Sequence, residues 1–223
     1  IVAEPGNETI TISQDKSCSV QIFPSTLYQT NVIWIEKVKD HAKVDRGFHL
    51  SSVYQLQPFN ISLRNEFNVA IRYDFDLVEH SNLGLYYFDS KKEEWTYLKT
   101  KNNRTKQILT ASMSEFDAIT IIQDLEPPEI ISMHPGNGGG YKLNDVNEII
   151  ILVNDRISGI DPNEDSFSLS LNNQPVYFAY QPIKKEISYK LEKTLTQGSH
   201  QIDFTVFDRL GNKTSRTVFF SIY

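Results

Sequence analysis

The sequence predicts an all-β protein built from two tandem β-sandwiches. Polar and apolar residues alternate with a period of two along most of the chain, while helical periodicity is nearly absent. Aromatic residues make up 12% of the 223 residues, and such side chains favour strands. The tandem prolines Pro127 and Pro128 then separate two strand-rich halves of ordinary domain size.

The first half contains eight alternating segments that we expect to be strands. They are residues 8–12, 17–22, 31–35, 67–73, 83–88, 95–98, 107–111 and 118–122. The polar run 89–92 predicts the turn of a hairpin between the fifth and sixth segments. Residues 74–80 are the one helix-like stretch, and we expect a loop or a single turn there.

The second half repeats this pattern after the prolines. The expected strands are residues 129–133, 148–153, 166–171, 176–178, 186–190, 201–207 and 215–222, with a glycine-rich turn at 137–140. Proline cannot donate a ladder hydrogen bond, so the pair breaks the sheet pattern and favours extended backbone. We therefore expect domains at 1–125 and 126–223 with a short, stiff joint between them.

Composition limits the classes of partner. The net charge of −6 argues against nucleic acid, because phosphate binding needs clustered Lys and Arg. No apolar run approaches the length of roughly 20 residues that a membrane-spanning helix needs. The single Cys18 cannot form an internal disulfide, and its neighbours suggest a small strand residue. The chain begins at Ile1 without a signal-peptide pattern, so we expect a mature or excised piece of a longer protein.

Four ordered motifs give the second half a family resemblance. They are Pro-Pro-Glu-Ile at 127–130, Asn-Asp-Arg-Ile-Ser-Gly-Ile-Asp at 154–161, Leu-Thr-Gln-Gly-Ser-His-Gln-Ile at 195–202 and Phe-Asp-Arg-Leu-Gly-Asn at 207–212. In this order they resemble the bacterial immunoglobulin-like domains of extracellular proteins. The resemblance implies that the second sandwich is immunoglobulin-like.

The first half is similar to the ZU-type β-sandwich. The matching elements are Ile-Phe-Pro-Ser-Thr-Leu at 22–27, Tyr-Gln-Leu-Gln-Pro at 54–58, the aromatic hairpin at 86–95 and Ser-Glu-Phe-Asp at 114–117. The two modules together resemble the C-terminal region of exported bacterial proteins, including some lysostaphin-like zinc peptidases.

These resemblances imply a non-catalytic accessory role. The chain would be extracellular, at the cell surface or in the periplasm, and would act as a spacer or presenting domain. Its partners would be other domains of the same polypeptide, or proteins and glycans of the cell surface. The alternatives are an accessory domain of a cell-wall peptidase and a carbohydrate-binding module.

The sequence also lacks the motifs of the enzymes considered. It has neither the His-x-His pair nor the His-Glu-x-x-His motif of zinc peptidases, and no Gly-x-Ser-x-Gly elbow. We therefore expect a protein that is not an enzyme and has no cofactor, calcium excepted.

Calcium is suggested by acidic residues near turns of the second half. Asp155, Asp161, Asp165 and Asp208 are the proposed ligands, because calcium prefers several oxygen ligands from loops. Asp155 and Asp208 each follow a long strand and could share one end of the sandwich. The alternative is that both carboxylates only accept hydrogen bonds from nearby backbone amides in turns.

Glycan binding is suggested by the aromatic hairpin of the first half. Tyr87, Trp95 and Tyr97 are the proposed contacts, since exposed rings can stack on sugars. Alternate residues of a strand point to opposite faces, so one set of these rings must fill the core. The alternative is cross-strand aromatic pairing that stabilises the hairpin.

Overall fold

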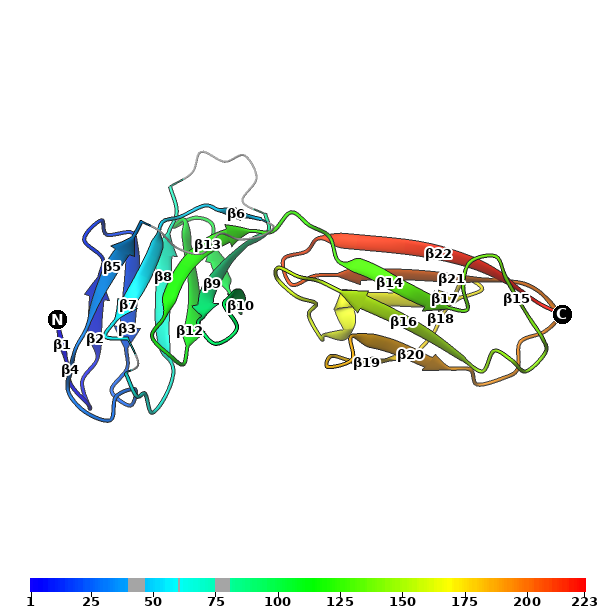
Figure 1. Ribbon diagram of the computed structural model, residues 1–223, viewed down its shortest axis with the longest axis horizontal. Coiled ribbons are helices and arrows are strands. Elements are labelled where there is room, and N and C mark those ends of the chain that lie inside the picture. The colour runs from blue at the N-terminus through cyan, green and yellow to red at the C-terminus, as the bar shows by residue number, and fades with distance from the viewer. Residues whose placement is uncertain (40–46, 60, 75–80) are drawn as a thin grey trace. The chain divides into compact units, whose positions relative to one another are not determined.

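The computed structural model describes residues 1–39, 47–59, 61–74 and 81–223. The loop or turn expected at 74–80 lies outside the described residues, apart from Asp74. Two compact units make up the chain, Ile1–Leu125 and Glu126–Tyr223 (Figure 1). Every regular element described is a strand except one short 3-10 helix, η1 (Glu164–Ser166), which confirms the all-β class.

Unit 1 contains two larger sheets and one two-stranded ribbon. The six-stranded sheet runs in the order β10 (Glu94–Leu98), β9 (Leu83–Asp89), β13 (Ala118–Gln123), β7 (Val53–Gln57) and β5 (Trp34–Val38), with β6 (Phe48–His49) also paired to β13. The five-stranded sheet runs in the order β11 (Lys101–Asn103), β12 (Ile108–Met113), β8 (Phe67–Arg72), β3 (Cys18–Ile22) and β2 (Thr9–Ile12). The ribbon pairs β1 (Val2–Ala3) with β4 (Asn31–Val32).

The core of unit 1 lies between its two larger sheets. Alternate residues of β3 are buried, including Val20 and Ile22, and so are alternate residues of β8, including Phe67 and Val69. Strands of the six-stranded sheet contribute residues such as Leu85 to the same core. This alternation is the period of two that predicted the strands.

Unit 2 contains a four-stranded and a five-stranded sheet. The first runs in the order β14 (Glu129–His134), β16 (Glu148–Asn154), β20 (Glu186–Lys190) and β19 (Ala179–Gln181). The second runs in the order β15 (Gly139–Tyr141), β22 (Lys213–Ile222), β21 (Gly198–Phe207), β17 (Phe167–Leu171) and β18 (Gln174–Pro175). All pairs are antiparallel except β15 with β22, which is parallel.

Unit 2 encloses a core of its own. Ile149, Ile151 and Val153 of β16 contribute to it from one sheet, and Phe204 and Val206 of β21 from the other. Each unit therefore buries an apolar interior that contains only its own residues.

The strand expected at 176–178 is not formed. This segment has no regular structure and connects β18 in one sheet to β19 in the other. Val176 and Phe178 still pack against the core, whereas Tyr177 is 97% exposed. The alternation of residues 176–178 therefore reflects which side chains pack on the core. It does not reflect strand pairing, because the backbone crosses here from one sheet to the other.

Candidate functional site

Two of the four proposed calcium ligands lie together in unit 2. Asp155 directly follows β16 and Asp208 directly follows β21, and their carboxylate oxygens lie within 4.8 Å of each other. The two loops are joined by a bridge between Ile160 and Asp208 and by a hydrogen bond of 2.9 Å from the Arg209 amide to the Gly159 carbonyl. The ends of two strands from different sheets therefore place both carboxylates in one cluster.

Both carboxylates accept hydrogen bonds from their own loops. Asp155 Oδ1 accepts from the backbone amides of Ile157 at 3.1 Å and Gly159 at 2.6 Å. Asp208 Oδ1 accepts from the amides of Leu210 at 2.8 Å and Asn212 at 2.9 Å. These are the turn hydrogen bonds that the sequence offered as the alternative to calcium.

The electrostatics of this pair disfavour two negative charges. Burial raises the pKa of the Asp155 carboxyl, the Gly159 amide opposes that change, and the nearby Asp208 charge raises the pKa further. Burial also raises the pKa of Asp208, while the side chain and backbone of Asn212 oppose it. The pair thus combines desolvation with the repulsion of like charges.

The other two proposed ligands occupy separate positions in the loop. Asp161 Oδ1 accepts a hydrogen bond of 3.1 Å from the Asn163 amide, and Asp165 is exposed within η1. Neither belongs to a group of three metal-ligating side chains among the described residues. Calcium binding by the four aspartates stays a prediction.

The proposed glycan contacts lie on two different faces of one hairpin. Tyr87 packs against the core of unit 1, and its cross-strand partner is Thr96. Trp95 pairs with Phe88 and Tyr97 pairs with Tyr86. Cross-strand partners share a face and neighbours alternate, so Trp95 and Tyr97 lie on the face opposite Tyr87.

Trp95 and Tyr97 both pack against other aromatic rings. The ring centroid of Trp95 lies 5.4 Å from that of Phe88 and 5.2 Å from that of His49. Tyr97 packs edge to face on Tyr86 at 5.5 Å. A Cβ atom on Gly84 would lie 2.8 Å from Tyr97 Cε2, so a side chain at this position would force the packed tyrosine rings to shift. Cross-strand aromatic pairing, the alternative reading of the hairpin, is thus present.

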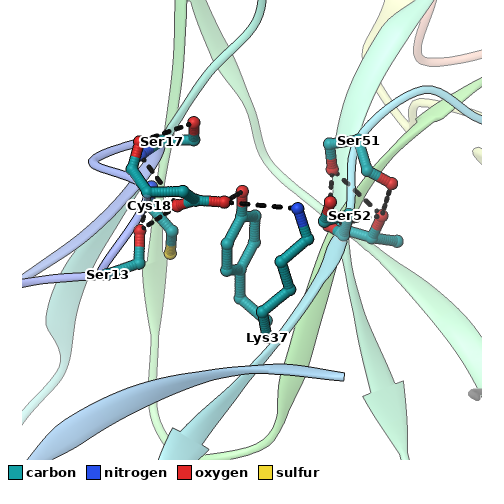
Figure 2. A network of polar contacts seen from close by, with 9 residues as sticks. Ser13, Ser17, Cys18, Lys37, Ser51 and Ser52 are labelled. Atoms are coloured by element: carbon teal, nitrogen blue, oxygen red, sulfur yellow. Dashed lines mark hydrogen bonds and ion pairs between the residues drawn. The ribbon is translucent and has the colours of Figure 1, made fainter. Parts of the chain in front are cut away.

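A polar network in unit 1 was not foreseen from the sequence. Asp15, in the turn between β2 and β3, accepts hydrogen bonds from the Ser13 hydroxyl at 2.7 Å, the Ser17 amide at 3.2 Å and the Tyr54 hydroxyl at 2.9 Å (Figure 2). Lys37 Nζ lies 3.5 Å from its carboxylate. The Ser-Gln-Asp-Lys-Ser segment signals a turn, but Tyr54 is 39 residues away and local patterns could not identify it.

This network stabilises negative charge on Asp15. Partial burial tends to raise the pKa of the carboxyl, but the hydrogen bonds from Ser13, Ser17 and Tyr54 and the Lys37 charge outweigh it, so the pKa is lowered. Burial and the hydrogen bond to Asp15 raise the pKa of Tyr54 to about 12. The tyrosine therefore remains a protonated donor at neutral pH.

Figure 2 also labels Cys18 and Ser51 of unit 1. Cys18 donates its backbone amide to the Ser13 hydroxyl at 2.9 Å, and burial raises the pKa of its thiol above the ordinary value. A buried thiol in this state is a core residue and a poor nucleophile. Ser51 Oγ accepts from the Ile121 amide at 2.9 Å and lies 3.1 Å from Thr120 Oγ1, which joins the segment before β7 to β13.

No family model and no curated protein sequence matches the chain. CopC from Methylosinus trichosporium OB3b aligns at 16% identity over 43% of this chain and 92% of CopC, with a TM-score of 0.35. Latent PorU from Porphyromonas gingivalis aligns at 13% identity over 71% of this chain and 22% of PorU, with a TM-score of 0.36. The extracellular domain of BT4673 from B. thetaiotaomicron aligns at 12% identity over 98% of this chain and 30% of that domain, with a TM-score of 0.29.

The chain spans less than a third of the length of PorU and of the BT4673 domain. In the part of the chain that the structure describes, no helix has the length and apolar character needed to span a membrane.

Proposed function

We propose that the chain is a non-catalytic, extracytoplasmic module that holds or presents a neighbouring domain of a larger protein. The observation that carries this proposal is that the two units each enclose a separate core. Along the chain they are connected by a short segment that contains Pro127 and Pro128. Asp15, Asp155 and Asp208 each accept hydrogen bonds that close their own turns. Such an arrangement suits a structural role.

The strand order of unit 2 supports an immunoglobulin-like assignment for that unit. The order β14-β16-β20-β19 follows the ABED sheet of that fold when strands are named along the chain. The order β15-β22-β21-β17-β18 contains the G, F and C strands in its middle, with one added strand at each edge. This assignment fits the resemblance of the four sequence motifs.

A spacer role requires a stiff joint, and spin labels can measure that stiffness. Exposed Lys101 and Lys193 provide one labelling position in each unit after substitution by cysteine, and buried Cys18 should remain unlabelled in the folded protein. We expect a narrow distribution of distances between the labels in electron resonance measurements. Replacing Pro127 and Pro128 by glycine should broaden it, because glycine removes the backbone restriction.

The control for this experiment is a pair of labels within unit 2, at Lys193 and Lys142, whose distance distribution should not respond to the glycine substitutions. A parent protein as broad as the glycine variant would contradict the spacer proposal.

Glycan binding by the hairpin is the second candidate, and one observation favours it. Trp95 and Tyr97 share the face of the sheet that points away from the core, where they are half-buried. Polysaccharide pull-down with Trp95→Ala tests it, with circular dichroism to verify folding. Retention equal to that of the parent protein would eliminate Trp95 as a contact.

A further inference from the structure

A hollow of 360 Å³ opens between two loops of unit 1. Tyr28, Gln29 and Asn31 line it from the segment that leads into β4. The opposite side consists of residues that follow β7, namely Pro58, Phe59, Ile61 and Ser62. Its volume lies at the small end of the range for ligand-binding pockets.

Backbone contacts fix both loops. Leu27, which is almost fully buried, forms an isolated bridge with Leu63, and the Arg64 amide donates to the Thr26 carbonyl at 2.8 Å. These contacts join the segment before Tyr28 to the segment after Ser62. The two sides of the hollow are therefore anchored close to the residues that line it.

Local hydrogen bonds add to this order within each side. Asn31 Nδ2 donates to the Gln29 carbonyl at 2.8 Å, and the Phe59 amide donates to the Gln57 side chain at 2.9 Å. A hollow with anchored sides loses less conformational entropy when a ligand binds.

Two aromatic rings are presented to solvent at this hollow. Tyr28 is 57% exposed and Phe59 is 49% exposed, although large apolar groups usually find cover in a core. The Arg64 guanidinium lies 5.1 Å from the centroid of the Tyr28 ring, which restricts the orientation of that ring. Exposed and oriented rings offer flat apolar faces to a ligand.

The remaining lining groups select the chemistry of the ligand. None of the lining residues that the structure describes is charged, and the charged contact described for them is that of Arg64 with the Tyr28 ring. Gln29, Asn31 and Ser62 each provide donors as well as acceptors. A cation would lose hydration there without gaining an opposite charge from these residues, and an anion would have to compete with the Tyr28 ring for Arg64. An extended proline-rich peptide offers chiefly carbonyl acceptors and would use only the donors.

We propose that this hollow binds a neutral oligosaccharide, with the apolar faces of sugar rings on Tyr28 and Phe59 and the hydroxyls on the amide and hydroxyl side chains. A spacer needs no ligand, so this site goes beyond the function proposed above, and its failure leaves that function intact. It also differs from the hairpin of Trp95 and Tyr97.

Titration of the complete 15N-labelled chain by amide NMR tests the site. The probes are the hexasaccharides of β-1,4-linked N-acetylglucosamine, β-1,4-linked glucose and β-1,3-linked glucose. We expect at least one to bind, with its largest shifts around Tyr28 and Phe59. Tyr28→Ala and Phe59→Ala should each weaken binding by about ten-fold or more, because each removes a stacking surface.

Tyr177→Ala is the matched control, because Tyr177 is an exposed tyrosine of the other unit, and it should bind as the parent does. Both lining aromatics are half exposed, so their substitution should leave the circular dichroism spectrum unchanged. Absence of binding by all three sugars at about 10 mM would overturn the proposal, since that corresponds to negligible affinity. Equal loss in Tyr177→Ala, or tighter binding of a proline-rich decapeptide at the same residues, would also overturn it.

Discussion

Asp15 in unit 1 and the pair Asp155 and Asp208 in unit 2 use the same residue type in similar turns, yet their pKa values move in opposite directions. Each carboxylate lies shortly after a strand and accepts hydrogen bonds from backbone amides further along the same loop, such as those of Ser17, Gly159 and Leu210. The pKa of Asp15 is lowered, whereas those of Asp155 and Asp208 are raised. Turn geometry alone therefore does not determine how easily a loop aspartate ionises.

The difference comes from burial and from the neighbouring side chains. Asp15 is partly exposed and has the Tyr54 hydroxyl and the Lys37 ammonium as additional partners. Asp208 is 4% exposed and has another carboxylate as its neighbour. Hydrogen bonds and an opposite charge favour the ionised form, while desolvation and a like charge oppose it.

The two units can be followed separately in solution. Both tryptophans, Trp34 and Trp95, lie in unit 1, so tryptophan fluorescence reports the unfolding of that unit alone. Far-UV circular dichroism reports both units. The part of the circular dichroism change that is not accompanied by a fluorescence change therefore reports the unfolding of unit 2.

The largest effect is expected from deleting the Asp208 carboxylate. Asp208→Ala should destabilise unit 2 by about 3 kcal/mol, because it removes a buried carboxylate and leaves the partly buried amides of Leu210 and Asn212 without their acceptor. Denaturant unfolding by circular dichroism measures the change, and the fluorescence transition of unit 1 should stay in place.

Asp208→Asn is the matched control for this deletion. It retains an oxygen acceptor and removes the repulsion with Asp155, so it should cost less than about half as much. Equal destabilisation by the two variants would show that the hydrogen bonds to Asp208 contribute little.

A smaller effect is expected from Asp15 because it is less buried. Asp15→Ala should lower the stability of unit 1 by about 1 to 2 kcal/mol, through loss of the hydrogen bonds from Ser13, Ser17 and Tyr54. Fluorescence-detected unfolding gives the value. Lys37→Met, which removes only an exposed ion pair, should cost less than about 1 kcal/mol. A larger loss in the lysine variant would assign the stabilisation to charge pairing instead.

The pKa shifts predict opposite slopes of stability with pH. The lowered pKa of Asp15 means that its contribution is present above the unfolded value and is lost as the pH falls through the folded value. Asp155 and Asp208 bind protons more tightly in the folded state, so ionisation destabilises unit 2 as the pH rises from the unfolded value through the folded one.

Variants separate these slopes from those of the other carboxylates. As the pH falls below about 4 to 5, Asp15→Asn should remove part of the acid sensitivity of the fluorescence transition. As the pH rises above about 4, Asp208→Asn should reduce the loss of unit 2 stability. A parallel pH profile for variant and parent in unit 2 would refute the raised pKa.

How far the sequence could predict the molecule differs between fold and site. Strands with one buried face, such as β3 and β8, can be recognised in the sequence because their side chains point alternately into the core and away from it. The segment 176–178 also alternates, but its backbone crosses between sheets, and a local pattern cannot distinguish these cases. Side-chain burial is therefore encoded more directly than backbone pairing.

The same limit applies to the candidate sites. Asp155 and Asp208 could be placed together because each follows a long strand and the ends of such strands lie at a common edge. The network of Asp15 joins its turn to Lys37 on β5 and Tyr54 on β7, and no local signal connects either residue to that turn. Which face Trp95 and Tyr87 occupy depended on the register of the hairpin, which the sequence left open.

The smallest effect concerns calcium and decides whether the acidic pair does more than close its loops. If calcium binds Asp155 and Asp208, about 2 mM calcium should stabilise unit 2 by less than about 1 kcal/mol, because millimolar affinity is typical of extracellular modules and stabilisation follows mass action. The midpoint of the circular dichroism transition should rise slightly with calcium and return with a chelator, while the fluorescence transition should not respond.

The variants Asp161→Asn and Asp165→Asn identify the ligands. They should retain the calcium response if Asp155 and Asp208 alone provide the carboxylates, and lose it if all four aspartates are ligands. An unchanged transition in the parent protein, together with the cost of Asp208→Ala, would leave turn closure as the whole role of the pair and complete the contrast with Asp15.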